Sequence, residues 1–258
     1  MSGFESLSPW LVAYVAIVIA VSGWVQGALG LGFPMIATPL IAAVTDIQFA
    51  VVIVLIPCLA TIVISIMRSP GFAEVLRRFW WMSLVALIGA MIGARLFVLF
   101  PQFPYALLLA VVILFYLNMD RLGRGQSPLM HRHDKAFGLL FGLLGGISES
   151  TANIAAPPLI IYYLGIGLPP LLLVPAMNIS FFVGKSTQFA TLAAGGIAAP
   201  SLWLLTLPLA VVATVTCLFG TRVRSRIDGP TYRIWMRRML LSMAVILLLQ
   251  VTYRYLNV

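Results

Sequence analysis

The sequence has few charged residues. Only 9% of its 258 residues are Asp, Glu, Lys or Arg, whereas 62% are hydrophobic, and the mean hydropathy is +1.07. A soluble globular domain normally contains about 25% charged residues. The composition therefore excludes an ordinary soluble domain and predicts a membrane protein whose chain enters the bilayer several times.

Residues suited to catalysis, metal binding or disulfide formation are also scarce. The two cysteines, Cys58 and Cys217, lie within apolar runs, where free cysteine behaves as a small hydrophobic residue. The two histidines, His131 and His133, lie in a polar segment without cysteine or carboxylate companions at metal-ligand spacing. Hydrolase, nucleotide-binding and haem motifs are absent. We therefore expect no metal, no cofactor and no enzymatic activity.

Acidic residues are scarcer than basic ones, with 7 Asp and Glu against 16 Lys and Arg, for a net charge of +9. The basic residues concentrate in three short segments, 68–78, 120–135 and 221–238, and residues 1–67 contain none. Basic loops of a membrane protein face the cytoplasm, which explains the charge without any binding of nucleic acid. Because residues 1–9 lack Lys and Arg, no cleavable signal peptide is expected.

Apolar segments recur along the chain in the same order in each half. They are residues 10–29, 35–44, 47–67, 79–100 and 105–119, followed by 136–158, 159–168, 171–194, 202–219 and 239–256. A span needs about 20 apolar residues, so the second segment of each half is too short to cross alone. The chain is therefore expected to contain a first transmembrane repeat at 1–119, a basic cytoplasmic linker at 120–135 and a second repeat at 136–258.

Both halves begin with a segment that glycine and proline interrupt. In the first half the interruption is Gly30, Gly32 and Pro34. In the second half Gly145, Gly146, Pro157 and Pro158 flank the polar residues Ser148, Glu149, Ser150, Thr151 and Asn153, which we expect to lie on unwound backbone. Such backbone must be sheltered from lipid, so we expect the two breaks to meet at one cavity near the membrane midplane.

Loop charge then sets the expected topology. If each broken segment enters the membrane and returns, as a helical hairpin or as two short crossings, all three basic segments lie on the cytoplasmic side. Both termini and the 195–200 loop then lie outside. Each half then crosses the membrane an odd number of times, so the two halves have opposite orientations. The expected fold is all-α and polytopic, with two inverted-topology repeats, each having a broken or hairpin first helix and three full spans.

Rare polar side chains within the apolar segments are candidate site residues. Lys185 lies inside its span and needs an anion, which could be Glu149 or a substrate, and Gln188 lies beside it. Asn178 is expected on the same face as Lys185, although an interhelical hydrogen bond is an alternative role. Glu149 could instead cap a helix, and the glycines could either expose backbone N–H groups to an anion or permit close helix packing.

Two glycine motifs, Gly27-Ala-Leu-Gly30-Leu-Gly32 and Gly142-Leu-Leu-Gly145-Gly146, are each followed by proline. Together with the segment from Pro157 to Pro169 that precedes Asn178, they make the chain resemble the sulfite exporter TauE/SafE family of membrane permeases. The resemblance covers nearly the whole chain and implies transport of sulfite, thiosulfate or organosulfonates without an ATP-hydrolysing partner. The chain departs from the family pattern at Phe33-Pro34 and in the polar insert 148–153.

We therefore expect a multi-pass permease of a bacterial-type inner membrane whose partners are a small anion, the lipid bilayer and coupling protons. Glu149 is the candidate coupling residue. The candidate substrate-binding residues are Gly30, Gly32, Pro34, Gly146, Ser148, Ser150, Thr151, Asn153, Asn178, Lys185 and Gln188. The alternatives are an anion channel and an intramembrane enzyme that uses Glu149 and Lys185.

Overall fold

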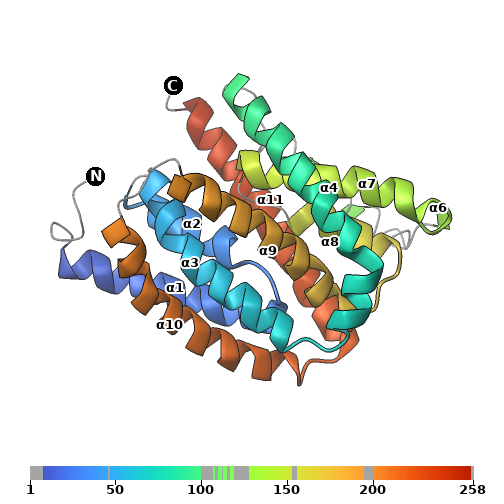
Figure 1. Cartoon of the computed structure of the whole chain (residues 1–258), viewed down its shortest axis with the longest axis horizontal. Coiled ribbons are helices and arrows are strands. Elements are labelled where there is room, and N and C mark those ends of the chain that lie inside the picture. The colour runs from blue at the N-terminus through green and yellow to red at the C-terminus, as the bar shows by residue number, and fades with distance from the viewer. Residues whose placement is uncertain are drawn as a thin grey trace.

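The computed structural model describes residues 8–45, 47–99, 128–152, 156–194 and 200–256, with scattered residues between 107 and 118. Its helices are α1 Pro9–Leu29, α2 Phe33–Ala42, α3 Ile47–Met67, α4 Phe72–Leu99, α6 Pro128–Arg132, α7 Asp134–Ala152, α8 Ala156–Gly165, α9 Pro170–Ala194, α10 Pro200–Arg224 and α11 Gly229–Leu256 (Figure 1). The described ranges contain no strand, which confirms the all-α fold class.

The predicted break in the first half is present between α1 and α2. Helix α1 begins where the Ser8 side chain accepts a hydrogen bond from the Leu11 N–H, and it ends at Gly30, whose φ is 78°. Gly32, with φ 107°, precedes α2. Both angles lie in the left-handed region that residues with a Cβ rarely adopt, so these two glycines allow the chain to leave one helix and begin the next.

Both broken segments double back as helical hairpins. Near the start of α1 the Tyr14 hydroxyl donates to the Leu40 carbonyl near the end of α2, at 3.0 Å. In the second half the Tyr162 hydroxyl, near the end of α8, donates to Asp134 at the start of α7. Each contact joins the beginning of one helix to the end of the next, so α1 and α2 are antiparallel, and so are α7 and α8.

The expected unwinding of Ser148 to Thr151 is wrong, because α7 remains helical through Ala152. Asn153 lies outside the described residues. The glycine pair does not interrupt the helix. Gly146 instead allows close packing, because a Cβ at this position would overlap the Ala86 carbonyl oxygen of α4. Glycine in a membrane helix therefore allowed two backbones to approach closely here, and did not expose the backbone.

Three other expected boundaries also differ. Helix α4 begins at Phe72 and not at residue 79, and α11 begins at Gly229 and not at residue 239. The linker 120–135 contains the short helix α6 and the start of α7. In all three places the helix continues through basic residues. The thickness of the hydrocarbon core sets the length of the apolar stretch, but a helix can extend beyond that stretch into water. Most of the expected span 105–119 lies outside the described residues.

Helices from opposite halves pack along each other. Helix α1 lies along α10, α4 lies along α7, and α3 contacts α9. Small residues allow the first two contacts: Gly27 faces Gly220 and the Cys217 carbonyl, while Gly146 faces Ala86 and Ala90. Hydrophobic side chains from both halves consequently share two buried cores.

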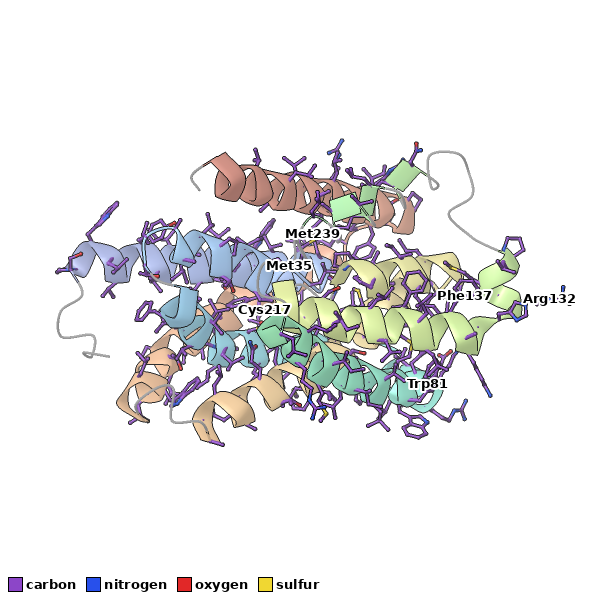
Figure 2. The ribbon with its side chains drawn as sticks, turned by 90° about the horizontal axis from the view of Figure 1, so that it is seen from above. Met35, Trp81, Arg132, Phe137, Cys217 and Met239 are labelled. Atoms are coloured by element: carbon purple, nitrogen blue, oxygen red, sulfur yellow. The ribbon has the colours of Figure 1, made fainter. Side chains whose placement is uncertain are left out.

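The outer surface fits a bilayer. Within the described residues, four helical stretches are long and apolar enough to cross a membrane: Pro9–Leu29, Phe49–Met67, Phe72–Gly93 and Leu202–Arg224. Side chains extend outward from the ribbon (Figure 2). Large apolar side chains that are more than 60% exposed include Ile17, Leu204 and Val211. Apolar exposure on this scale is unusual for a soluble monomer, so these faces contact lipid.

Described residues from the three basic segments lie together at one end of the bundle. Arg78 at the start of α4 forms an ion pair with Asp134 at the start of α7, at 3.7 Å. Arg224 at the end of α10 donates to the Ser69 hydroxyl in the α3–α4 connection, at 3.3 Å. These two contacts bring residues from 68–78, 120–135 and 221–238 together, as the expected topology requires.

Candidate functional site

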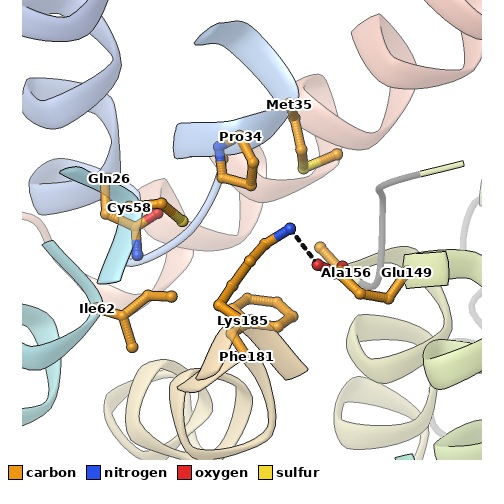
Figure 3. Close-up of a pocket in the computed structure, with 10 residues that line it drawn as sticks. Gln26, Pro34, Met35, Cys58, Ile62, Glu149, Ala156, Phe181 and Lys185 are labelled. Atoms are coloured by element: carbon orange, nitrogen blue, oxygen red, sulfur yellow. Dashed lines mark ion pairs between the residues drawn. The ribbon is translucent and has the colours of Figure 1, made fainter. Parts of the chain in front are cut away.

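A cavity lies where the first broken segment meets the second. Its walls contain Gln26, Gly32, Pro34, Met35, Cys58 and Ile62 from the first half, and Glu149, Ala156, Phe181 and Lys185 from the second (Figure 3). The cavity volume is about 20 Å³. One water molecule requires about 10–15 Å³ by this measure, so the cavity is too small for a sulfur oxyanion in this conformation.

An ion pair crosses the cavity between two long helices. The Lys185 ammonium, midway along α9, contacts the Glu149 carboxylate near the end of α7 (Figure 3). The Lys185 and Glu149 side chains are 4% and 13% exposed. Lys185 also donates to the Gln188 side-chain oxygen at 3.0 Å. The cavity therefore holds a cationic side chain and an acidic side chain in direct contact.

Two short helices begin at the cavity, which adds positive potential to it. Pro34 and Met35 are in the first turn of α2, and Ala156 is the first residue of α8. The N-terminus of a helix carries about half a positive charge. However, Pro34 and the α8 residues Pro157 and Pro158 have no backbone N–H, so these helix ends supply fewer hydrogen-bond donors than the glycine motifs suggested.

An amide network fixes the break next to the cavity. The Gln26 side-chain nitrogen donates to the Asn178 side-chain oxygen at 3.0 Å and to the Gly30 carbonyl at 3.2 Å. The Asn178 nitrogen donates to the Gly30 carbonyl at 2.6 Å, and the Phe33 N–H donates to the Gln26 oxygen at 3.2 Å. The two amides thus bind backbone groups that the end of α1 and the start of α2 leave without partners, which makes the interhelical bond of Asn178 a structural contact.

The expected site residues separate into three groups. Gly32, Pro34, Glu149 and Lys185 line the cavity, while Gly30, Asn178 and Gln188 adjoin it. Gly146 and Ser148 make structural contacts away from the cavity wall. Gly146 packs on α4, and the Ser148 hydroxyl donates to the Leu144 carbonyl at 2.6 Å. The side chains of Ser150 and Thr151, like the whole of Asn153, lie outside the described residues.

The sequence reasoning missed Gln26. It is 1% exposed, it lines the cavity, and it holds the first break in place. Its signal was present, because Gln26 is an amide in an otherwise apolar run and lies four residues before Gly30. Cys58, Ile62 and Phe181 were also missed, and nothing distinguishes these three from core residues in the sequence. The described part of the chain holds no cluster of three or more His, Cys, Asp or Glu residues that could bind a metal ion.

We expect Gln26→Leu and Asn178→Leu each to lower the free energy of unfolding by about 1–3 kcal/mol, because each leaves buried polar groups without partners. The double variant should lose less than the sum of the two single losses, since both residues belong to one network. Thermal and denaturant unfolding of the purified protein measures these losses. Additive losses would show that the amides act independently.

A model of the family described as sulfite exporter TauE/SafE matches residues 15–249 of the chain. Searches of curated proteins and of solved structures found no match. The matched range includes both broken segments, the amide network and the ion pair.

Proposed function

The chain belongs to the sulfite exporter TauE/SafE family, and on that premise we propose that it is a secondary transporter that binds a small sulfur-containing anion at the Lys185 cavity. The family places the chain among multi-pass membrane transporters of sulfur anions. The observation that carries the proposed site is the buried Lys185–Glu149 pair, which stands where the two broken segments meet.

The charge balance of the cavity suggests how an anion is taken up. An anion inside a low-dielectric cavity needs a cationic partner, and Lys185 is the cation that lines this cavity. Glu149 competes for the same ammonium group. If Glu149 accepts a proton, Lys185 is released to the anion and the net charge of the cavity is unchanged. We therefore propose that one proton on Glu149 accompanies each monovalent anion through the site.

The small cavity volume supports a mechanism that includes opening. An oxyanion cannot enter about 20 Å³, so residues in the wall must move apart before binding. The wall includes the tips of both hairpins, where the second helix of each hairpin begins, at Pro34 in α2 and at Ala156 in α8. We propose that movement of these hairpins relative to α9 widens the site.

We also infer that residues 1–119 and 136–258 are inverted repeats. The pattern of packing supports a repeat, because the first helix of each half lies along a later helix of the other half in a parallel direction. The inversion itself rests on the odd number of crossings expected in each half. In one contact Gly23 faces Ala213 and Gly27 faces Gly220. In the other, helices α7 and α4 pair in the same way, since Gly142 faces Val85 and Gly146 faces Ala90.

The proposed orientation places the end with Arg78 and Arg224 in the cytoplasm and both termini outside. Single cysteines introduced at Ser127 and Ala198 test it. A membrane-impermeant maleimide added outside intact cells should label A198C and leave S127C unlabelled until the membrane is permeabilised. The unsubstituted protein is the control, since its own Cys58 and Cys217 are buried. Labelling of S127C alone from outside would contradict the orientation.

Flux measurements in proteoliposomes test the function. Uptake of sulfite or thiosulfate should saturate with concentration, and it should respond to an imposed pH gradient, because Glu149 carries the coupling proton. Protein-free liposomes and an organic carboxylate of similar size are the controls. A conductance that rises linearly with concentration and ignores the pH gradient would identify a channel and contradict the proposal.

A further inference from the structure

A second cation, Arg224, lies partly buried at the basic end of the bundle, away from the Lys185 cavity. Arg224 is the last residue of α10, and one of its two terminal nitrogens, Nη1, is fully buried with no hydrogen-bond partner. Neither of the two ion pairs formed by the described residues includes Arg224. The ionisable groups that act on it electrostatically are Tyr232 and Cys217, a phenol and a thiol.

The neighbouring hydroxyl groups hold the guanidinium in place but do not compensate its charge. The other terminal nitrogen of Arg224, Nη2, donates to the Ser69 hydroxyl at 3.3 Å. That hydroxyl gives its own proton to the Ser65 carbonyl at 2.5 Å. The Tyr232 hydroxyl likewise donates to the Leu29 carbonyl, at 2.6 Å. Both hydroxyl groups are neutral, and neither accepts a hydrogen bond from Nη1, which is covered by protein and has no acceptor.

A purely structural role does not account for this arrangement. An arginine that reaches toward lipid headgroups from a helix end exposes its terminal nitrogens, whereas Nη1 of Arg224 is covered by protein. The carbonyl groups at the end of α10 offer some compensation through the helix dipole, but they leave Nη1 without a hydrogen bond. A buried guanidinium nitrogen without an acceptor is costly, so its persistence indicates an anionic ligand.

The position of Arg224 connects it to the cavity. Tyr232, which acts on Arg224 electrostatically, binds the Leu29 carbonyl at the end of α1. The next carbonyl, that of Gly30, is bound by Gln26, which lines the cavity. Polar groups thus lie between the basic end of the bundle and the cavity wall.

We propose that Arg224 binds an oxyanion group at the basic end of the bundle, at a site separate from the Lys185 cavity. The guanidinium suits sulfite, sulfate or phosphate oxygens, which form strong charge-assisted hydrogen bonds with arginine. Nη1 is the terminal nitrogen that would donate to the oxyanion, because Nη2 already donates to Ser69. The oxyanion group belongs either to a free anion or to a lipid headgroup phosphate. Binding at Arg224 does not depend on the proposed transport function. Only the further step, in which a free anion moves from Arg224 to the Lys185 cavity, rests on it.

The test uses the full-length protein in nanodiscs of phosphatidylcholine, with Glu149→Gln and Lys185→Met introduced so that the cavity no longer contributes. Sulfite and, separately, inorganic phosphate are titrated while the melting temperature is followed. Either anion should raise it. Adding Arg224→Gln should weaken the apparent affinity by about tenfold or more. Arg226→Gln, an exposed arginine in the next connection, is the matched control and should respond as the background protein does.

A second set of nanodiscs contains phosphatidylglycerol and no added oxyanion. If this lipid alone stabilises the background protein but not its Arg224→Gln variant, and abolishes the response to sulfite, the oxyanion group is the phosphate of an anionic headgroup, since phosphatidylcholine carries its phosphate beside a compensating positive charge. Arg224→Lys, which keeps the charge without the planar group, should fold and bind with intermediate affinity. Equal responses of the Arg224→Gln and Arg226→Gln variants in every nanodisc would overturn the proposal. Because the cavity pair is absent throughout, this result does not depend on transport through Lys185.

Discussion

Lys185→Met is expected to lower the free energy of unfolding by about 3–5 kcal/mol, because it leaves the Glu149 carboxylate buried without its counter-charge. The same substitution should abolish saturable anion transport, since the cavity loses its cation. Glu149→Gln should destabilise the protein by a similar mechanism, because it leaves Lys185 uncompensated. Its transport should also lose the response to a pH gradient.

The double variant Glu149→Gln/Lys185→Met separates stability from function. It removes both charges together, so it should recover most of the stability lost in either single variant, while transport stays absent. Thermal unfolding and sulfite flux in proteoliposomes are measured for all four proteins. Lys135→Met is the matched control, because Lys135 is exposed at the start of α7, and it should change neither property.

Two outcomes would contradict this account. Four proteins of equal stability and equal flux would show that neither residue belongs to the site. A stable Lys185→Met protein that fails to bind sulfite would instead show that the substrate, and not Glu149, is the usual partner of the ammonium group.

Gly27→Leu and Gly146→Leu are expected to have the next largest effects. A Cβ at Gly27 would overlap the Cys217 carbonyl oxygen of α10, and one at Gly146 would overlap the Ala86 carbonyl oxygen of α4. Both obstacles are backbone atoms of a packed helix, which cannot rotate away as a side chain can. We expect each substitution to cost at least about 1–3 kcal/mol and to separate the two helices.

The two glycine variants should resemble each other, because each disturbs a close backbone contact between a helix of one half and a helix of the other. Gly229→Ala is the control: Gly229 is the first residue of α11, and no atom lies within 4 Å of a Cβ added there. Thermal unfolding and the yield of folded protein from membranes give the measurement. A Gly27→Leu protein as stable as Gly229→Ala would mean that α1 and α10 do not pack closely.

Several features of the fold could be predicted from sequence because they depend on local chemistry. The break at Gly30 and Gly32 is an example, since glycine adopts positive φ easily. The opposite case is Gly146, where the same residue type lies within a regular helix. Whether a glycine bends the chain or admits a neighbour depends on what packs against it, and that neighbour, Ala86, is distant in the sequence. The expected unwinding of Ser148 to Thr151 failed for this reason.

The candidate site shows the same division. Glu149 and Lys185 could be selected from sequence, because a charge in an apolar segment needs a partner. The importance of Gln26 could not be assigned, since its role depends on contact with Asn178 from the other half. Cys58, Ile62 and Phe181 carry no signal at all, because an apolar residue in a cavity wall has the same chemistry as one in a core.

The sequence by itself determined three properties of this protein: its location in a membrane, the position of its first helix break, and the side chains that are too polar to face lipid. The tertiary structure alone decided that Lys185 meets Glu149, that two amides hold Gly30, and that Arg224 keeps a buried nitrogen without an acceptor. The physical reason is that lipid tails and neighbouring helices are equally apolar. Hydrophobicity therefore places a helix in the bilayer, but close packing and hydrogen bonds between distant segments select its neighbours.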